Sequence, residues 1–340
     1  MSQQAHSNPL RILAGDIGGT YTRLAACTVD SRFRVRTGNV FRMATRQPGV
    51  DSFASFWQAV RDMAPPELGD ETAFDAVGLA LAGSVAGDRA VLPNIDWDIG
   101  TGDLDPFASF CLVNDFVAQG WALAANGIRH LEPVREGQDG PGAVAMVGAG
   151  TGLGHCSIHP PTDARDGELN PGWSVTGSEA GHATFAFHGL EEKEIEERLL
   201  ELTGEAWLSN DDVVSGPGAA RLHTALSGET VEPAEALRDP DGETARWFAR
   251  LYARACRNYC LNIFPVSRLV ISGGVAARNP HLVHSSAFRE EFEDAGAYRN
   301  LLHHIPIGLN RDQDLGMTGA AVFAAVRLRA AGPAKPPGTY

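Results

Sequence analysis

The sequence is poor in lysine, in cysteine and in net positive charge. Of the 28 basic residues only Lys193 and Lys335 are lysines, so a mechanism that depends on lysine has two candidates. A net charge of −14 argues against a nucleic-acid scaffold or a protein of anionic membrane surfaces, since both need basic patches. The 5 cysteines are widely spread and odd in number, which fits a reducing compartment better than a disulfide framework.

Long apolar runs are also missing. No run approaches the roughly 18 residues that span a bilayer. The first residues, MSQQAHSNP, have no basic segment followed by an apolar one, as a signal peptide does. We therefore expect a cytoplasmic protein that binds no membrane and no nucleic acid. The length of 340 residues and the hydrophobic share of 44% are those of a globular enzyme with two domains.

Glycine, by contrast, is abundant and clustered. Many of the 38 glycines follow short apolar runs, which is the pattern of buried strands in an α/β protein. Such strands are predicted over residues 10–14, 77–81, 143–147 and 268–271. Helices are predicted over 116–125, 191–202 and 247–264. In the second helix Ile195, Leu199 and Leu202 face inward, the acidic residues form a solvated face, and Gly204 is the C-cap.

One layout occurs twice. In each copy an apolar strand leads into a glycine-rich turn that contains threonine, and a second apolar stretch follows. The first copy surrounds residues 15–20 and the second surrounds residues 148–154, with Thr20 and Thr151 in equivalent places. The repeat predicts two similar half-molecules that face each other across a cleft.

Glycine-rich turns after strands often bind phosphate, because backbone N–H groups converge there on an anion. Neither lysine lies in a GxxxxGK[ST] motif, and the strand lysine and HRD loop of a protein kinase are missing. The run Gly148-Ala149-Gly150-Thr151-Gly152 comes near a dinucleotide fingerprint, but a strand rather than a helix follows it. A dinucleotide site is therefore disfavoured.

What remains is Asp16-Ile17-Gly18-Gly19-Thr20, at the end of the first strand. Gly18 and Gly19 allow backbone amides to approach a phosphate, and Asp16 can hold a hydrated Mg²⁺. The same residues also suit a plain β-hairpin with glycine at positive φ. Local sequence alone leaves both interpretations open.

A set of seven stretches decides between these interpretations. They are LAGDIGGTYTRLA (13–25), LVNDFVAQG (112–120), VGAGTGLG (147–154), GSEAGHATF (177–185), VVSGPG (213–218), ISGGVAAR (271–278) and LGMTGAA (315–321). In this order they resemble the bacterial glucokinases of the actin/hexokinase-like phosphotransferase superfamily, and they cover nearly the whole chain. The CxCGxxGCxE zinc site of the related repressor–ORF–kinase sugar kinases is missing, so the fit is to the non-zinc branch.

The resemblance implies an α/β fold of two actin/hexokinase-like (ribonuclease H-like) domains flanking a cleft. The smaller domain is expected to comprise residues 10–112 with a returning helix at 318–331, and the larger 113–317. The ends, 1–9 and 332–340, are expected to be flexible. The resemblance further implies a homodimer that phosphorylates D-glucose at O6 by direct in-line transfer, with ATP and Mg²⁺ as cofactors.

Asp115 is the general base that the resemblance implies. It follows a predicted strand over 110–113 and opens a helix, which places its carboxylate at the C-terminal end of a strand. The alternative is a helix cap, because Asn114-Asp115 before an apolar helix is a favoured capping sequence.

Four residues are the implied sugar ligands: Asn114, Glu179, His182 and Asp211. The i, i+3 spacing of Glu179 and His182 puts them on one face of a helix, where a surface salt bridge is the alternative role. Asp211 is the main departure from the family, which usually has glutamate at this position, four residues before Ser215. The missing methylene puts sugar specificity and affinity in question, but not the chemistry.

The implied nucleotide ligands lie in three glycine-rich segments. Asp16 acts on Mg²⁺ through water. The first turn contributes Gly18, Gly19 and Thr20, and the second contributes Gly150, Thr151 and Gly152. Gly273 and Gly274 let the adenosine pack close to the backbone.

Two other functions stay open. One is a kinase for another hexose or an amino sugar, which Asp211 favours. The other is a non-catalytic sugar-binding regulatory protein, which Asp115 together with all the phosphate motifs disfavours.

Cys256 and Cys260 are spaced i, i+4 on a predicted helix, and we expect buried thiols there rather than metal ligands.

Overall fold

A computed structural model describes residues 8–92, 95–100, 109–127, 130–138, 140–161 and 172–331. The termini that we expected to be flexible lie outside these residues, apart from Asn8 and Pro9. The described residues divide into two compact units. The first unit holds those up to 127, residues 161, 172 and 173, and those from 314 onward. The second unit holds those from 130 to 160 and from 174 to 313.

The first unit is built on a mixed sheet with the strand order β3-β2-β1-β5-β9, and β4 also pairs with β2. A separate sheet has the order β6-β7-β8. The strands are β1 (Leu10–Ile17), β2 (Tyr21–Val29), β3 (Val35–Thr37), β4 (Phe41–Ala44), β5 (Ala76–Leu81), β6 (Ser84–Ala86), β7 (Arg89–Leu92), β8 (Trp97–Gly100) and β9 (Phe110–Asn114). The helices are α1 (Phe53–Met63), α2 (Pro66–Gly69), η1 (Glu71–Ala73), α3 (Asp115–Asn126) and α12 (Leu315–Ala331).

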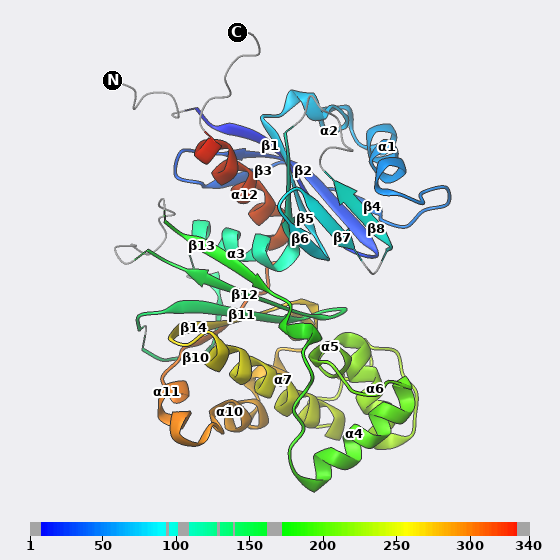
Figure 1. Ribbon diagram of the computed structural model, residues 1–340, viewed down its shortest axis with the longest axis vertical. Coiled ribbons are helices and arrows are strands. Elements are labelled where there is room, and N and C mark those ends of the chain that lie inside the picture. The colour runs from blue at the N-terminus through cyan, green and yellow to red at the C-terminus, as the bar shows by residue number, and fades with distance from the viewer. Residues whose placement is uncertain are drawn as a thin grey trace. The chain divides into compact units, whose positions relative to one another are not determined.

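Strand β1 is buried on both of its faces, as its nearly continuous apolar sequence predicts. Leu13 and Ile17 point to the face that packs against α1, whereas Ile12 and Ala14 point to the face that packs against α12. Figure 1 shows α12 lying along the sheet, with α3 beside it.

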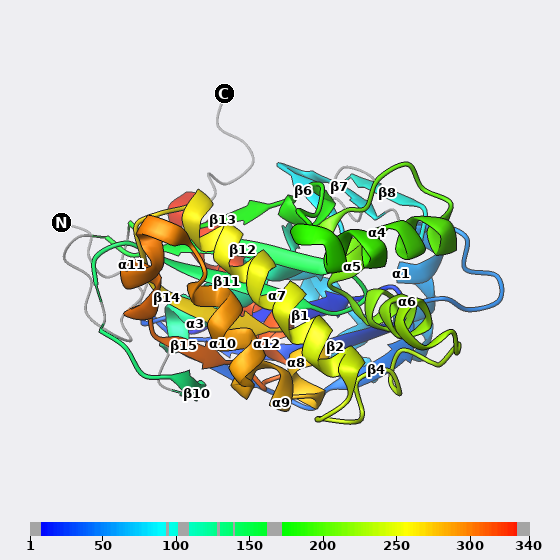
Figure 2. The same ribbon diagram turned by 90° about the horizontal axis from the view of Figure 1, so that it is seen from below.

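The second unit has one mixed sheet, with the strand order β10-β15-β14-β11-β12-β13. Its strands are β10 (Glu132–Arg135), β11 (Ala143–Ala149), β12 (Leu153–His159), β13 (Ser174–Ser178), β14 (Val266–Ser272) and β15 (Ile307–Leu309). Its helices are η4 (Ala180–His182), α4 (Gly189–Thr203), α5 (Asn210–Val213), α6 (Gly216–Ser227), α7 (Glu243–Asn262), α8 (Gly274–Arg278), α9 (His281–His284), α10 (Ser286–Glu293), η5 (Gly296–Tyr298) and α11 (Arg299–His303). Figure 2 shows α7 crossing the sheet, with α10 packed beside it.

The two main sheets share one topology, which confirms the repeat seen in the sequence. In each, the first strand pairs antiparallel with the second and the second with the third. The fourth strand then joins the other side of the first in parallel, and the fifth joins the fourth in parallel. Strands β1, β2, β3, β5 and β9 therefore correspond to β11, β12, β13, β14 and β15.

The observed division of the chain differs from the predicted one at three points. Residues 161, 172 and 173 belong to the first unit, although they fall within the range 113–317 predicted for the larger domain. Helix α3 belongs to the first unit, because it packs against α12 and β9. The chain also returns to that unit at Asp314 rather than at residue 318. Asp115, which opens α3, consequently lies in the first unit and not in the second.

The buried face of α4 lies one helical turn closer to the N-terminus than the predicted one. Ile195 and Leu199 are buried, but Leu202 is 47% exposed, whereas Glu192 is only 2% exposed. Residues 192, 195 and 199 share one face of a helix, so the buried face includes an acidic residue. The prediction of a fully solvated acidic face is therefore wrong at Glu192.

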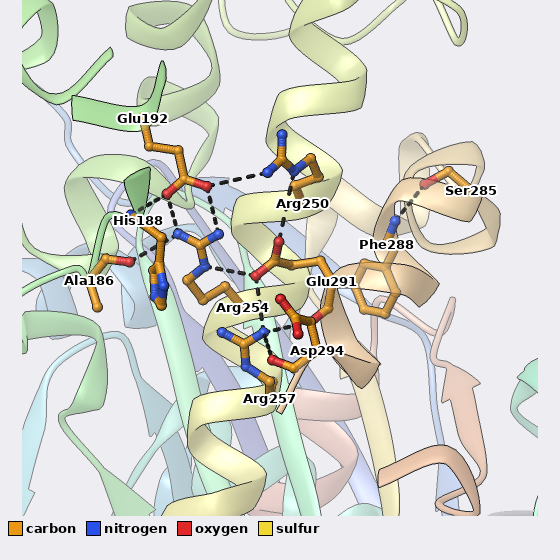
Figure 3. Close-up of polar contacts among 10 residues, drawn as sticks. All are labelled: Ala186, His188, Glu192, Arg250, Arg254, Arg257, Ser285, Phe288, Glu291 and Asp294. Atoms are coloured by element: carbon orange, nitrogen blue, oxygen red, sulfur yellow. Dashed lines mark hydrogen bonds and ion pairs between the residues drawn. The ribbon is translucent and has the colours of Figure 1, made fainter. Parts of the chain in front are cut away.

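The buried charge of Glu192 is matched by Arg254 of α7. Both carboxylate oxygens of Glu192 accept hydrogen bonds from Arg254, that from Nη2 at 2.7 Å. Arg254 Nε also donates to Glu291 of α10 at 2.9 Å, and Arg257 donates to the same oxygen at 3.0 Å. Arg250 adds a longer contact to Glu192 at 3.4 Å (Figure 3). This buried ion network joins α4, α7 and α10.

The network also shifts the pKa of the Glu291 carboxyl. Burial raises the pKa of the Glu291 carboxyl, but its hydrogen bond to Arg254 and the charges of Arg254, Arg257 and Arg250 outweigh burial and leave the pKa below its ordinary value. A carboxylate with a depressed pKa stabilises the fold above its unfolded pKa. That stabilisation is lost as the pH falls through the folded value.

Replacing Arg254 is expected to destabilise the second unit strongly. Arg254→Met leaves Glu192 and Glu291 buried without their main cation, which costs about 3–5 kcal/mol. Urea unfolding at neutral pH measures this loss. Arg246→Met removes an exposed arginine from the same helix and should change stability by about 0.5 kcal/mol or less. Equal unfolding midpoints for the two variants would show that the network contributes nothing.

Candidate active site

The first glycine-rich turn, residues 18–20, joins β1 to β2. The Gly18 N–H donates to the Tyr21 carbonyl at 3.1 Å. Thr45, which follows β4 and is fully buried, donates from its hydroxyl to the Gly18 carbonyl at 2.7 Å and from its N–H to the Thr20 carbonyl at 2.9 Å. The turn is therefore held from a neighbouring strand. Sequence reasoning missed Thr45, because a threonine in a short strand-like stretch has no distinctive pattern.

Asp16 lies at the end of β1, where Arg23 of β2 is its cross-strand neighbour. Arg23 donates to Asp16 Oδ2 at 2.5 Å and to Asp314 at 3.0 Å, so one guanidinium joins both strands to the start of α12. Burial raises the pKa of the Asp16 carboxyl, although the Arg23 charge acts in the opposite direction. One oxygen of Asp16 is thus engaged by Arg23. The other, Oδ1, accepts no hydrogen bond from the described residues.

Asn114 and Asp115 stand where β9 passes into α3. The cap of this helix is Asn114, whose Oδ1 accepts from the Phe116 N–H at 2.9 Å and the Val117 N–H at 3.1 Å. Asn114 Nδ2 donates to the Gly83 carbonyl at 3.0 Å. Asp115 is the first residue of the helix, and its Oδ1 shares the Phe116 N–H at 2.9 Å. The capping role proposed as the alternative for Asp115 therefore belongs mainly to Asn114.

The predicted site residues that the first unit contains lie at one edge of its sheet. Ile17 pairs with Leu81, and Leu81 pairs with Asn114. Strands β1, β5 and β9 are parallel, so their carboxyl ends meet at this edge. The turn at 18–20 and Asp115 are then about two strand spacings, or roughly 10 Å, apart. Ligands of α/β sheets bind at the carboxyl ends of strands.

The second glycine-rich turn, residues 150–152, joins β11 to β12. The Gly150 N–H donates across the turn to the Gly152 carbonyl at 2.7 Å, and the Gly216 N–H at the start of α6 donates to the Gly150 carbonyl at 2.8 Å. Thr20 lies two positions before Thr22, the first paired residue of β2. Thr151 likewise lies two positions before Leu153, the first paired residue of β12. Between the paired ends of the strands, the first copy has one residue more (18–21) than the second (150–152).

Gly273 brings the end of β14 against the end of β11. It adopts φ +87°, and a Cβ at this position would lie 2.4 Å from the Ala149 carbonyl oxygen. Gly274 then begins α8. The predicted nucleotide residues of the second unit, 150–152 and 273–274, thus lie at one edge of its sheet. This arrangement corresponds to that of the first unit.

Glu179, His182 and Asp211 form one cluster in the second unit. Glu179 precedes η4 and His182 ends it, and the tighter three-residue turn brings Glu179 Oε2 to 3.7 Å from His182 Nε2. The other ring nitrogen of His182 lies 3.8 Å from Asp211 Oδ2. The imidazole therefore stands between two carboxylates. Because Glu179 and His182 are exposed, their interaction adds little stability. Their exposure leaves both side chains accessible to a ligand.

Asp211 is held in a narrow slot. Its Oδ1 accepts from the Leu153 N–H at 2.7 Å, directly after the second turn. A Cβ at Gly152 or at Gly181 would lie 2.6 Å or 2.3 Å from its carboxylate oxygens. Burial raises the pKa of the Asp211 carboxyl, while the Leu153 N–H lowers it. The carboxylate is thus drawn back against the backbone of the turn and of η4.

The backbone around this cluster is supported from two sides. Asn210 of α5 donates from Nδ2 to the carbonyls of Ala180 and Ala183, at 2.8 and 3.1 Å. On the other side, Arg254 donates to the Ala186 carbonyl at 3.1 Å, and Glu192 accepts from the His188 N–H at 2.6 Å (Figure 3). The buried ion network therefore also anchors the chain that follows η4.

No group of three or more histidine, cysteine, aspartate or glutamate residues within the described ranges could hold a metal ion. Cys256 and Cys260 are buried free thiols, as predicted. None of the helices in the described part of the chain has the length and apolar character needed to cross a membrane.

The close approach at Gly273 gives a testable consequence. Gly273→Ala and Gly228→Ala both place alanine at positive φ, +87° and +78°, but a Cβ at Gly228 meets no atom within 4 Å. Strain at positive φ costs each variant about 1–2 kcal/mol. Gly273→Ala must also displace the end of β11, which adds about 1–3 kcal/mol. Thermal unfolding should therefore begin at clearly lower temperature for Gly273→Ala, and matching curves would contradict the close approach.

Comparison with known proteins agrees with the geometry. A family model described as glucokinase matches residues 13–327. The glucokinase of Synechocystis sp. is 28% identical to this chain, with 93% of the chain and 98% of the relative covered. The glucokinase of Pectobacterium atrosepticum is 29% identical, with 92% and 96% covered.

A solved structure supports the fold independently. The crystal structure of glucokinase from Balamuthia mandrillaris in complex with glucose matches with a TM-score of 0.75 and 19% identity, and 95% of each chain is covered. At this identity the likeness shows the fold alone, and that fold is the one predicted. With the family model matching nearly the full length, the chain belongs to the glucokinase family of sugar kinases.

Proposed function

We propose that this chain transfers the γ-phosphate of ATP to the 6-hydroxyl of D-glucose. The observation that carries the proposal is the placement of Asp115, at the carboxyl edge of the first sheet beside the turn at 18–20, in a chain of the glucokinase family. Asn114 supplies the main helix cap, and Asp115, the first residue of α3, places its carboxylate at the helix N-terminus. By the same family match we propose a cytoplasmic homodimer.

The proposed step is a single in-line displacement. The sugar O6 forms a bond to the γ-phosphorus while the bond from that phosphorus to the bridging oxygen of ADP breaks. The O6 proton passes to the Asp115 carboxylate. Because the transition state of phosphoryl transfer is loose, positioning and charge stabilisation contribute more than the basicity of the carboxylate. No phosphoenzyme is needed.

The sugar is proposed to bind to Asn114, Glu179, His182 and Asp211. Hydroxyl groups of a sugar both donate and accept, and these side chains supply both kinds of partner. Asn114 has already used Oδ1 for the helix cap and one Nδ2 hydrogen for Gly83, so it has one N–H to offer. An epimer that leaves one of these groups without a partner binds less well.

The phosphates are proposed to bind to the two glycine-rich turns, residues 18–20 and 150–152, with the adenosine beside Gly273 and Gly274. Mg²⁺ arrives with ATP and neutralises charge on the β- and γ-phosphates. Asp16 fits a water-mediated role toward that ion, because Arg23 engages its Oδ2 and its Oδ1 accepts no hydrogen bond from the described residues. Arg23 would keep the carboxylate oriented.

A substrate panel tests the function. ADP release is measured with Mg-ATP and glucose, mannose, fructose, galactose, glucosamine or N-acetylglucosamine, and with a blank lacking sugar. Glucose should dominate. Absence of release above the blank for every sugar, from folded protein, would contradict the proposed activity and favour a non-catalytic sugar-binding protein.

One observation favours a second candidate, a kinase for an amino sugar. The Asp211 carboxylate is drawn back to the Leu153 N–H, which leaves more room on its open side than a glutamate would. Asp211→Glu should then lower kcat/KM for glucosamine relative to glucose by about tenfold, because a group that fits badly in a sugar site costs roughly that much or more. The same panel measures the ratio. An unchanged ratio would mean that residue 211 does not select the sugar.

Loss of the Asp115 carboxylate is expected to abolish most turnover. Asp115→Ala should reduce kcat by about 10²-fold or more, since general-base catalysis contributes about 10²–10⁴. The melting temperature should stay close to that of the wild type. Asp62→Asn changes an exposed carboxylate of α1 in the same unit and serves as the control. Near-normal kcat in Asp115→Ala would remove Asp115 from the mechanism.

A further inference from the structure

Tyr252 is a fully buried tyrosine near the middle of α7. Its hydroxyl accepts a hydrogen bond from the Ala149 N–H at 3.2 Å and donates to the Ser272 carbonyl at 3.4 Å. Ala149 is the last residue of β11, and Ser272 is the last residue of β14. One side-chain hydroxyl therefore joins the ends of two parallel strands.

These two strands separate just beyond the hydroxyl. They pair in parallel up to Gly148 and Ser272. The chain then continues from β11 into the turn at 150–152, and from β14 into Gly273 and α8. Beyond these residues the two strands no longer pair with each other, and buried backbone groups need hydrogen-bond partners. The Tyr252 hydroxyl supplies a partner to both.

A second side chain fixes the same end of β14. Asn310 is buried, and its Nδ2 donates to the Ser272 hydroxyl at 3.0 Å, while its N–H donates to the Ile271 carbonyl at 2.8 Å. Ser272 is thus held from β15 on one side and from α7 on the other. The Tyr252 contact also reaches β11, at the Ala149 N–H.

We propose that Tyr252 is a positioning residue for the nucleotide, because its hydroxyl sets the spacing between the turn at 150–152 and the turn at 273–274. The inference rests on the nucleotide role proposed for those turns. ATP affinity should then depend on the hydroxyl. Sugar affinity should depend on it much less, because the cluster of Glu179, His182 and Asp211 is held by Leu153, Asn210 and the ion network.

The protonation state of the hydroxyl suits this role. Burial raises the pKa of Tyr252 well above its ordinary value, so the group stays protonated and can donate to Ser272 at every pH of interest. Its ring also packs against Phe248 and Phe288, which keeps the side chain in place when the hydroxyl is removed. Tyr252→Phe is therefore a deletion of the two hydrogen bonds with little change in packing.

The chain offers a matched control. Tyr259 lies on the same helix and is also buried, but its hydroxyl faces Ser157 of β12 and its ring packs at a tilt against His155. Tyr259→Phe removes the same atom from the same helix without touching either turn. Any loss of stability that comes only from deleting a buried hydroxyl should appear in both variants.

The experiment is steady-state kinetics of both variants with ATP and glucose varied separately. Tyr252→Phe should raise KM for ATP about five- to tenfold, leave KM for glucose within about twofold, and lower kcat less than KM for ATP rises. A tenfold change corresponds to about 1.4 kcal/mol, the size expected for a buried hydrogen bond that is lost. Tyr259→Phe should keep KM for ATP within about twofold. Parallel changes in both KM values, or an unchanged KM for ATP, would overturn the proposal.

Hydrogen exchange of the wild-type protein provides a measurement that needs no variant. The β,γ-imido analogue of ATP should slow exchange of the Ala149 amide more than glucose does. If Tyr252→Phe does not fold, the exchange comparison tests the proposal instead. Protection of the Ala149 amide by the analogue that is equal to or weaker than protection by glucose overturns the proposal. The test is separate from that of the proposed function, since wild-type turnover on the sugar panel is measured independently. An inactive wild type would reject the sugar kinase activity, and the exchange comparison would then decide the role of Tyr252.

Discussion

Backbone groups at the ends of buried strands must find hydrogen-bond partners, and this requirement shapes every part of the candidate site. A strand inside a sheet satisfies its N–H and C=O groups along the ladder, but its last residues lose that ladder where the chain turns away. In this protein side chains from distant elements replace it. Thr45 serves the turn after β1, Asp211 serves the first residue of β12, and Tyr252 serves the ends of β11 and β14. The glycine-rich turns are consequently held by hydrogen bonds from distant side chains where phosphate is proposed to bind.

The strands and turns could be predicted from the sequence, whereas the distant side chains that hold them could not. An apolar run stopped by glycine is a local signal, so the strands, the two turns and the helix opened by Asp115 were all placed correctly. Tyr252 lies 103 residues from Ala149, and Thr45 lies 27 residues from Gly18. Within its own segment Tyr252 fits an ordinary inward-facing helix position. Nothing near it in the sequence indicates that its hydroxyl is needed at a strand end.

Burial of charge explains the error of prediction in α4. A helical face is normally inferred from its apolar residues, which placed the buried face of α4 at Ile195, Leu199 and Leu202. Glu192 belongs to that face because Arg254, itself almost fully buried, supplies its counter-charge from α7. A charged residue can lie in the core only if a partner is there as well. Because the partner is on another helix, the pattern of one helix cannot reveal it.

The same reasoning applies to the shorter carboxylate at position 211. Asp211 is not a truncated glutamate left in an unchanged site, because its Oδ1 has a backbone partner at Leu153 and glycines at 152 and 181 provide the space for it. A glutamate has one more methylene, so its carboxylate could keep the Leu153 bond only by folding back, or reach outward and leave that N–H unpaired. The aspartate instead couples the second glycine-rich turn to His182, 3.8 Å from its Oδ2. In the proposed function, contact with the sugar then falls chiefly to His182 and Glu179. The departure from the family changes the distance of the carboxylate rather than the charge of the site.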